Sequence, residues 1–212
     1  MHPPSPVALI TGSGKGIGRE AARLLAAAES LLLQLDVSDP AAATSAVTRT
    51  AARFGRLDAV VHCAGVAPQL PLEQTTLDDW HNVINTNLSS AFYLAKAAWP
   101  HFKQQGGGII VNISSEAARD PFPSFAAYGA AKAGLNLLGR SLAKEGAPHN
   151  IRVHTLAPAA VETQMFRNLV TRDQWPAEKT LSPTDVAEAI LSCLTGPLRH
   201  TSGDVVWLHK TI

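Results

Sequence analysis

The sequence has little of several features that would assign it to a specialised class of protein. It has two cysteines among 212 residues, Cys63 and Cys193, too few for a disulfide scaffold and typical of a reducing cytoplasm. The net charge is +1 and no basic run stands out, so neither nucleic acid nor an anionic membrane is an expected partner. No apolar run approaches the ~20 residues of a membrane span, and the N-terminus lacks the pattern of a signal peptide.

What the sequence does contain is a regular alternation of two kinds of segment. Short apolar runs predict buried strands at residues 7–11, 31–37, 57–65, 108–115, 151–158 and 204–208. Between them, helices are expected at 17–29, 38–54, 77–105 (in two segments), 124–145 and 182–194. This order predicts a single α/β domain over residues 1–212. In it, helices cover both faces of a doubly wound, parallel, Rossmann-like sheet.

A glycine cluster, TGSGKGIG at residues 11–18, lies between the first expected strand and the first expected helix. In that position the free N–H groups and the dipole of the helix N-terminus can bind the pyrophosphate of a dinucleotide. Glycine there lets a phosphate approach the backbone closely. The cluster alone is also consistent with an ordinary turn between a strand and a helix.

A second pattern places Tyr128 and Lys132 on one face of an expected helix. The pKa of a free tyrosine is near ~10, and a neighbouring ammonium is expected to favour the phenolate and lower that pKa. Ser115 ends the preceding strand at the sheet edge that faces the same crevice, where its hydroxyl can hold a substrate oxygen. A lone Y-x-x-x-K would usually be a surface pair, but the agreement of several motifs in order and spacing favours an active site.

Further motifs are HCAG at 62–65, Asn87 within INTNLSSAF, VNISS at 111–115 and PAAVET at 158–163. Over nearly its whole length the chain resembles the short-chain dehydrogenase/reductase family, and within it the compact branch that includes bacterial sepiapterin reductases and ketone reductases. The resemblance implies hydride transfer between a nicotinamide cofactor and a small-molecule carbonyl or alcohol. It implies Tyr128 as general acid/base, Lys132 as the residue that binds the nicotinamide ribose, and Ser115, rather than its neighbour Ser114, as the substrate-orienting hydroxyl. Asn87 would keep a water in the proton relay.

The resemblance also implies which residues contact the cofactor, and it implies no metal. Gly12, Gly16 and Gly18 would form the pyrophosphate turn, and Thr163 would bond the nicotinamide carboxamide. The full expected set is Gly12, Ser13, Lys15, Gly16, Ile17, Gly18, Asp36, Ala64, Gly65, Tyr128, Lys132, Pro158 and Thr163. Relatives pair their long helices, here residues 88–105 and 124–145, between subunits, so a homodimer or homotetramer is expected.

The chain departs from the family pattern after the first helix, where one strand–helix unit is missing. In one register residues 31–36 replace the second strand, and Asp36 binds the adenosine ribose and favours NAD(H). In the other, which the continuous match through GRLDAVVHCAG favours, LDVSD matches the third strand, Asp36 lies beside the adenine, and the specificity residue is lost. Lys15 favours NADP(H), because its charge can meet a 2′-phosphate. The shortening also motivates an alternative function, a catalytically impaired relative that acts as a binding or scaffold protein.

Smaller departures concern the core and the substrate side. His62 stands where the family has asparagine, and we expect it to be a hydrogen-bonded core histidine rather than a catalytic group. An apolar substrate pocket could be lined by Met165, Phe166, Leu169 and Trp175, but ordinary helix packing explains these residues equally well.

Overall fold

A computed structural model describes residues 6–26, 31 and 33–211 of the protein. Its centre is a five-stranded parallel sheet in the order β1-β2-β3-β4-β5. The strands are β1 (Ala8–Thr11), β2 (Ala59–His62), β3 (Gly108–Ile113), β4 (Ile151–Pro158) and β5 (Val205–Leu208). All carboxyl ends therefore meet at one edge, which is where ligands bind in such sheets.

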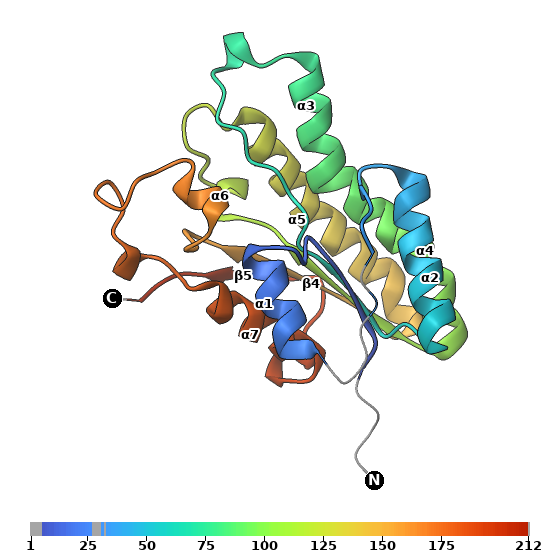
Figure 1. The fold of residues 1–212 in the computed structure, drawn as a ribbon. Helices are drawn as coiled ribbons and strands as arrows, with labels where there is room; N and C mark the ends of the chain where they lie inside the picture. The colour runs from blue at the N-terminus through green and yellow to red at the C-terminus, as the bar shows by residue number, and fades with distance from the viewer. Residues whose placement is uncertain (1–5, 27–30, 32, 212) are drawn as a thin grey trace.

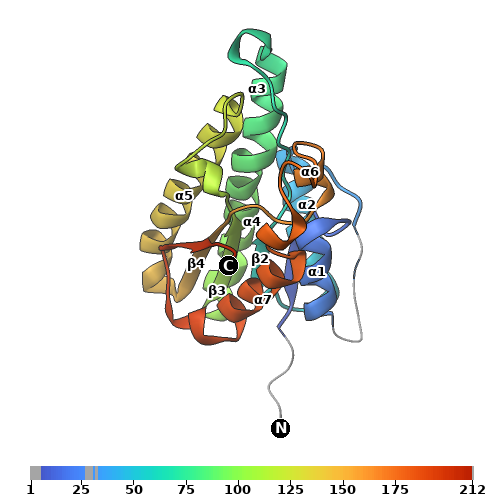
Figure 2. The same ribbon diagram turned by 90° about the vertical axis from the view of Figure 1, so that its left-hand side faces the viewer.

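Helices cover both faces of the sheet (Figures 1 and 2). On one face, α1 (Gly16–Leu25) and α7 (Pro183–Leu194) pack against an apolar cluster that includes Val61, Val111 and Leu156. On the other face, α2 (Pro40–Phe54), α4 (Ser90–Gln105) and α5 (Ala126–Gly146) pack against a cluster that includes Val60, Ile110 and Val153. Because neighbouring side chains of a strand point to opposite faces, both clusters come from the same strands. The expected α/β, Rossmann-like fold is thus confirmed.

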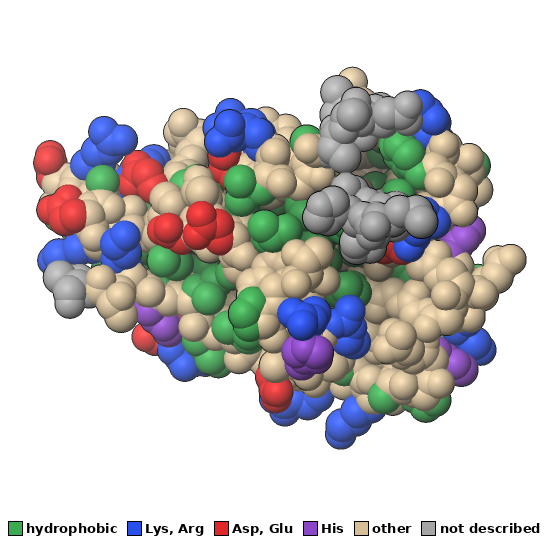
Figure 3. Space-filling model, turned by 90° about the horizontal axis from the view of Figure 1, so that it is seen from below, with side chains coloured by type: hydrophobic (Ala, Val, Ile, Leu, Met, Phe, Trp, Pro, Cys, Tyr) green, Lys and Arg blue, Asp and Glu red, His purple; other side chains and the backbone are tan. Residues whose placement is uncertain are grey.

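The remaining elements are short. α3 (Leu77–Ile84) continues through one π-helical turn, η2 (Asn85–Ser89), into α4. α6 (Gln164–Arg167) follows β4. Single 3-10 turns are η1 (Leu72–Gln74), η3 (Glu116–Ala118), η4 (Ala147–His149), η5 (Ala177–Lys179) and η6 (Pro197–His200). Among the described residues, no helix is long and apolar enough to cross a bilayer. Lys and Arg side chains are scattered over the face that Figure 3 shows.

Local chemistry explains where the long helices begin and end. Asp39 caps α2 through Ala41 N, and Ser182 forms a capping box with Asp185 at the start of α7. Gly55 and Gly106 end α2 and α4 with φ of 71° and 81°, in the left-handed region that glycine adopts without strain. The expected starts and stops at these positions are confirmed.

The strand expected at residues 31–37 is wrong, because none of the described residues in that range belongs to a strand. Leu31, Leu33 and Leu35 are half-buried, while Gln34 and Asp36 are exposed. The leucines are thus partly buried although the segment makes no strand pairing. An apolar pattern alone does not distinguish a paired strand from such an irregular segment. The end of the helix expected at 17–29 lies outside the described residues. The helix expected from residue 124 begins at Ala126, because Ser124 has a φ of 70°.

Candidate active site

The turn between β1 and α1 has the geometry of an anion cradle. A Cβ on Gly18 would lie 2.5 Å from Gly12 O, and one on Gly12 would lie 2.9 Å from Ala64 N, so both positions require glycine. Gly12 and Gly16 have φ of 66° and 55°, in the left-handed region. No side chain caps the N-terminus of α1 and no acidic residue lies in its first turn, in contrast to the side-chain caps of α2, α3 and α7. The N–H groups of this helix end therefore suit a pyrophosphate.

Thr11 fixes this turn against the neighbouring strand. Its Oγ1 accepts hydrogen bonds from Cys63 N at 3.2 Å and from Ala64 N at 3.1 Å. The carboxyl ends of β1 and β2 are thereby tied together beside the cradle. The glycine motif begins with Thr11 but predicts no role for it, although a threonine that ends a buried strand was the available signal.

Ser115 and Tyr128 come together at the carboxyl end of β3. Ser115 caps η3 by accepting from Ala117 N at 3.2 Å, and its side chain lies near enough to Tyr128, in the first turn of α5, to lower the pKa of that phenol. The Tyr128 ring packs edge-on against Phe125, with 5.6 Å between centroids. Burial raises the pKa of Tyr128, and the nearby Ser115 side chain lowers it in part. The structure thus brings together the expected hydroxyl pair. Ser114 instead points inward and donates to Lys132 O at 3.3 Å.

Lys132 lies one turn further along α5 and is 4% exposed. Its Nζ donates to Ile113 O at 2.7 Å and lies 5.6 Å from the centre of the Tyr128 ring. Burial lowers the pKa of Lys132 to about 8. The expected lowering of the Tyr128 pKa by this ammonium is wrong for this structure. The net shift is upward, because burial dominates and the ammonium is directed to the backbone of β3.

Asn87 is the fourth expected catalytic residue. It is fully buried and lies within the π-helical turn η2. Its Nδ2 donates to Val66 O and to Val83 O, both at 2.9 Å, and its Oδ1 accepts from Val66 N at 3.3 Å. A Cβ on Gly65 would lie 2.7 Å from Asn87 Oδ1 and 3.7 Å from Lys132 Nζ, so these residues are direct neighbours. The amide of Asn87 therefore holds the loop after β2 in place. π-Helical turns recur at functional sites.

Comparison with known proteins identifies the family. A profile described as Enoyl-(Acyl carrier protein) reductase matches residues 7–208. D-threitol dehydrogenase of Mycolicibacterium smegmatis is 34% identical over 204 residues, covering 84% of this chain and 78% of the relative. The 3-oxoacyl-(acyl-carrier-protein) reductase FabG of Escherichia coli is 32% identical over 233 residues, covering 93% of this chain and 96% of the relative. The chain belongs to the short-chain dehydrogenase/reductase family.

Solved structures agree with this assignment. The 3-ketoacyl-(acyl-carrier-protein) reductase of Brucella melitensis, complexed with NADH, superposes with a TM-score of 0.89 at 25% identity, covering 97% of each chain. A 7α-hydroxysteroid dehydrogenase complexed with NADH has a TM-score of 0.90 at 22% identity, which shows the shared fold. The FabG alignment spans 233 positions against the 212 residues of this chain, so that relative has residues that this chain lacks.

Membership fixes the class of reaction. This short-chain dehydrogenase/reductase is an oxidoreductase that transfers a hydride between a nicotinamide cofactor and a carbonyl or alcohol group of a small molecule. The relatives that match over most of the chain are named dehydrogenases and reductases. They favour the enzyme over the alternative of a catalytically impaired scaffold.

The structure gathers most of the expected cofactor contacts at the carboxyl edge. Ser13, Lys15, Gly16, Ile17 and Gly18 form the turn and first helical residues after β1. A Cβ on Gly16 would lie 3.4 Å from Thr163 Cγ2, which places the turn against the segment after β4. The other members of this edge are Ala64 and Gly65 after β2 and Pro158 at the end of β4.

Asp36 is placed differently. It lies in an exposed turn just before α2, where its Oδ1 accepts from Ser38 N at 2.9 Å and from Ser38 Oγ at 2.8 Å. These two bonds lower the pKa of Asp36. Since residues 31–36 do not form a strand in the described part, the register in which Asp36 ends a second strand is not supported. The other register places LDVSD on a strand as well, so the described residues lack the strand that either register expects.

The segment after β4 folds back on itself beside the site. Arg167 Nε donates to both carboxylate oxygens of Glu162, at 3.0 and 3.1 Å, and holds the pKa of Glu162 down to about 2. Phe166 and Trp175 pack edge-on with 6.2 Å between ring centroids. Met165 and Leu169 are half-buried. Phe166 and Trp175 thus contact each other, and whether the four residues line a substrate pocket stays a prediction.

Proposed function

We propose that Tyr128 is the general acid/base of this oxidoreductase and that Ser115 orients the reacting oxygen. The observation that carries this proposal is the position of the two residues at the carboxyl edge of the sheet, with Ser115 directly after β3 and Tyr128 in the first turn of α5, next to the buried Lys132. A substrate oxygen within reach of both hydroxyls would be held by Ser115 and would exchange its proton with Tyr128. The bound nicotinamide supplies or accepts the hydride.

Lys132 and Asn87 complete the proposed proton path. A pKa of about 8 lets the Lys132 amine gain and lose a proton near neutral pH, as a relay requires. We assign Lys132 to the nicotinamide ribose as well, because its ammonium lies between Tyr128 and Gly65 at the crevice. The Asn87 side chain is fully engaged with Val66 and Val83, so any part it takes in a relay is through its backbone carbonyl.

We further propose NADP(H) as the preferred cofactor, with NAD(H) also accepted. Lys15 is exposed directly before the uncapped N-terminus of α1. Within the described residues, no hydrogen bond or ion pair engages its ammonium, which can therefore bind a 2′-phosphate.

We also propose that residues 1–212 form one nucleotide-binding domain. The unpaired thiols of Cys63 and Cys193 support residence in a reducing cytoplasm.

Replacing Tyr128 by phenylalanine tests the assignment of roles. We expect Tyr128→Phe to lower kcat by at least about 10²-fold with a simple diketone or aldehyde, since a general acid contributes that much. NADPH binding, followed by fluorescence titration, is expected to remain. The matched control is Tyr93→Phe, because Tyr93 is the other tyrosine and lies away from the site on α4. Equal activity of the two variants would contradict the role of Tyr128.

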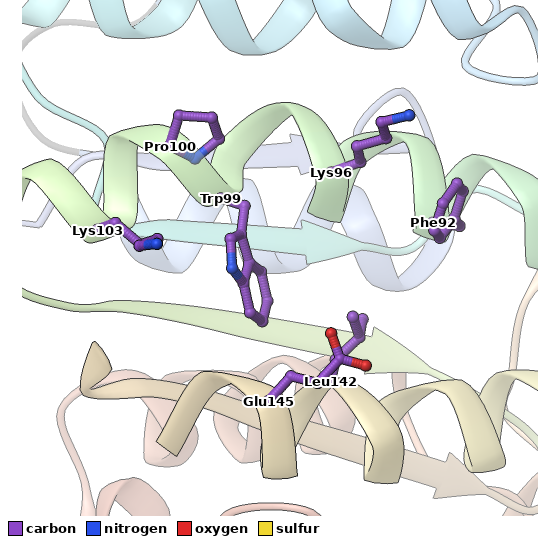
Figure 4. A pocket seen from close by; sticks show the side chains of 7 residues that line it. All are labelled: Phe92, Lys96, Trp99, Pro100, Lys103, Leu142 and Glu145. Carbon is purple, nitrogen blue, oxygen red and sulfur yellow. The ribbon is translucent and has the colours of Figure 1, made fainter. Parts of the chain in front are cut away.

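We propose that the outer faces of α4 and α5 pair with a second copy of this chain, giving a homodimer or homotetramer. A cavity of about 560 Å³ opens between these helices (Figure 4). It is lined by Phe92, Lys96, Trp99, Pro100, Lys103, Leu142 and Glu145. Phe92 remains 45% exposed, and the lining carries two lysines on α4 and one glutamate on α5. A two-fold axis would bring such a face, with both signs of charge, against itself.

Light scattering at micromolar concentration tests this pairing. The wild type is expected to be a dimer or tetramer, and Phe92→Asp is expected to shift it toward the monomer. Leu72→Asp is the control, because Leu72 is 79% exposed but lies in η1, outside this face. A monomeric wild type, or equal effects of both variants, would refute the proposed interface.

A further inference from the structure

The nucleotide-binding architecture of this chain is unequal in its two halves. Dinucleotide-binding folds join two βαβαβ halves, each of which binds one mononucleotide, and the sheet order reverses where they meet. Here β2, α4, β3, α5 and β4 form one complete half. Of the other half, the described residues contain β1 and α1. β1 is the first strand in the sheet order and pairs with β2, so the order does not reverse.

The connection after α1 is too short to supply what is missing. Residues 26–39 join Leu25 to Pro40, and their described members, 26, 31 and 33–39, form no helix or strand. A further strand with its crossover needs at least about a dozen residues. The remaining residues of this connection, 27–30 and 32, are too few for that. The shortening is therefore a property of the chain, whatever the course of those residues.

The two halves of a bound dinucleotide would meet very different surroundings. The nicotinamide mononucleotide half would face Ser115, Tyr128, Lys132 and Thr163, and its phosphate would lie at the cradle of Gly12, Gly16 and Gly18. The adenosine half would extend past β1, which is the edge strand of the sheet among the described residues. On that side the described chain offers the exposed turn at Asp36, with one carboxylate oxygen already bonded twice by Ser38, and the ammonium of Lys15.

We infer that this enzyme recognises the reduced nicotinamide mononucleotide about as well as it recognises NADH. The adenine and its ribose add little binding free energy, and a 2′-phosphate adds a contact with Lys15. The ligand class is therefore a nicotinamide ribose phosphate, with or without the adenosine. The inference rests on the proposed active site, because the same residues hold the nicotinamide half.

Isothermal titration of the full-length protein with reduced nicotinamide mononucleotide, NADH and NADPH tests the inference. We expect the dissociation constants of the mononucleotide and of NADH to agree within about threefold. We expect NADPH to bind about five- to tenfold more tightly than NADH at low salt, and this advantage to shrink at high ionic strength, since an exposed charge pair is screened.

Variants at the start of α1 separate the contribution of the 2′-phosphate to binding from that of the rest of the cofactor. Lys15→Ala is expected to bring NADPH to the affinity of NADH and to leave the mononucleotide unchanged. Arg19→Ala is the matched control, because Arg19 is also an exposed cation near the start of α1, but its Nε lies 3.6 Å from Glu20 Oε1. It is expected to preserve the NADPH advantage.

Two results would overturn the inference in different ways. NADH binding more than about tenfold tighter than the mononucleotide would show that the adenosine is recognised after all, and would leave the proposed active site intact. Failure of all three ligands to bind to the folded protein would overturn the proposed cofactor site, and with it this inference. A folded state by circular dichroism is the check that distinguishes that result from misfolding.

Discussion

His62 makes the free energy of unfolding depend on pH in a way that can be calculated from its surroundings. The imidazole is 1% exposed, and its Nε2 lies 2.6 Å from Ser90 Oγ. Ser90 Oγ itself donates to Thr86 O at 2.7 Å, so it accepts from Nε2–H of the histidine. Nδ1 is then a buried acceptor without a partner among the described residues. Adding a proton there would bury a charge.

The direction of the effect follows from the pKa. Burial, followed by the charge of Lys132, lowers the pKa of His62 to about 3, from 6.5 for a free imidazole. Between these two values the unfolded chain binds a proton that the folded protein does not. Stability is therefore lost as pH falls below 6.5 and continues to fall until about pH 3. From about pH 7 to about pH 5 this one group removes about 2 kcal/mol from the free energy of unfolding.

Urea unfolding of the wild type and of His62→Asn at these two pH values measures the effect. The variant has its own stability offset from lost packing, so the quantity to compare is the change between the two pH values. We expect that change to be about 2 kcal/mol smaller in His62→Asn. His154, whose pKa burial lowers to about 4, acts in the same direction, but it is present in both proteins and cancels. Protein concentration is held fixed, since assembly would shift apparent stability.

An exposed histidine provides the control. His81 lies on the solvent side of α3, and His81→Asn is expected to keep the wild-type dependence on pH. If His62→Asn loses as much stability on acidification as the wild type, the imidazole is not held neutral by burial. The reasoning from the Ser90 hydrogen bond to the unpartnered Nδ1 would then be refuted.

Two further predictions concern the cofactor cradle and the buried amine. Gly18→Ala is expected to weaken NADPH binding by more than about tenfold in a fluorescence titration, because its Cβ would lie 2.5 Å from Gly12 O. Gly14→Ala, whose Cβ would have no atom within 4 Å, should bind normally, and equal losses would contradict the role of the turn. Between about pH 8 and about pH 10 the wild type is expected to gain about 2 kcal/mol of stability relative to Lys132→Met, since the unfolded amine is still protonated where the folded one is not. Parallel pH dependences in urea unfolding would refute the depressed pKa of Lys132.

The sequence predicts most of the fold because its strands and helices carry strong local signals. The starts of α2 and α7 follow from Asp39 and Ser182, and the ends of α2 and α4 follow from Gly55 and Gly106. The error at residues 31–37 has a clear cause. Alternate leucines of this segment are partly buried without strand pairing. The sequence pattern does not show whether a neighbouring strand is available to pair with.

The active site is predictable as a set of residues but not in its electrostatics. The spacing of Tyr128 and Lys132 does place them on one face of α5. It could not show that Lys132 Nζ is directed to Ile113 O, or that burial outweighs other effects on the pKa of Tyr128. Nor could it show that the side chain of Asn87 bonds Val66 in the loop after β2 and Val83 in α3. These properties depend on what surrounds each polar atom, and that is fixed by packing between distant segments.

The catalytic residues can keep their geometry without the missing strand–helix unit, because every tie between them lies on one side of β1. Ser115 follows β3, Tyr128 and Lys132 lie on α5, and their mutual contacts involve β3 alone. The cradle is joined to that side through Thr11, whose hydroxyl bonds the backbone after β2. Nothing in this chain of contacts passes through the outer edge of β1. A change beyond that edge therefore acts on the adenosine and leaves the reacting groups where they are, which is why cofactor affinity and catalysis are expected to respond to different substitutions.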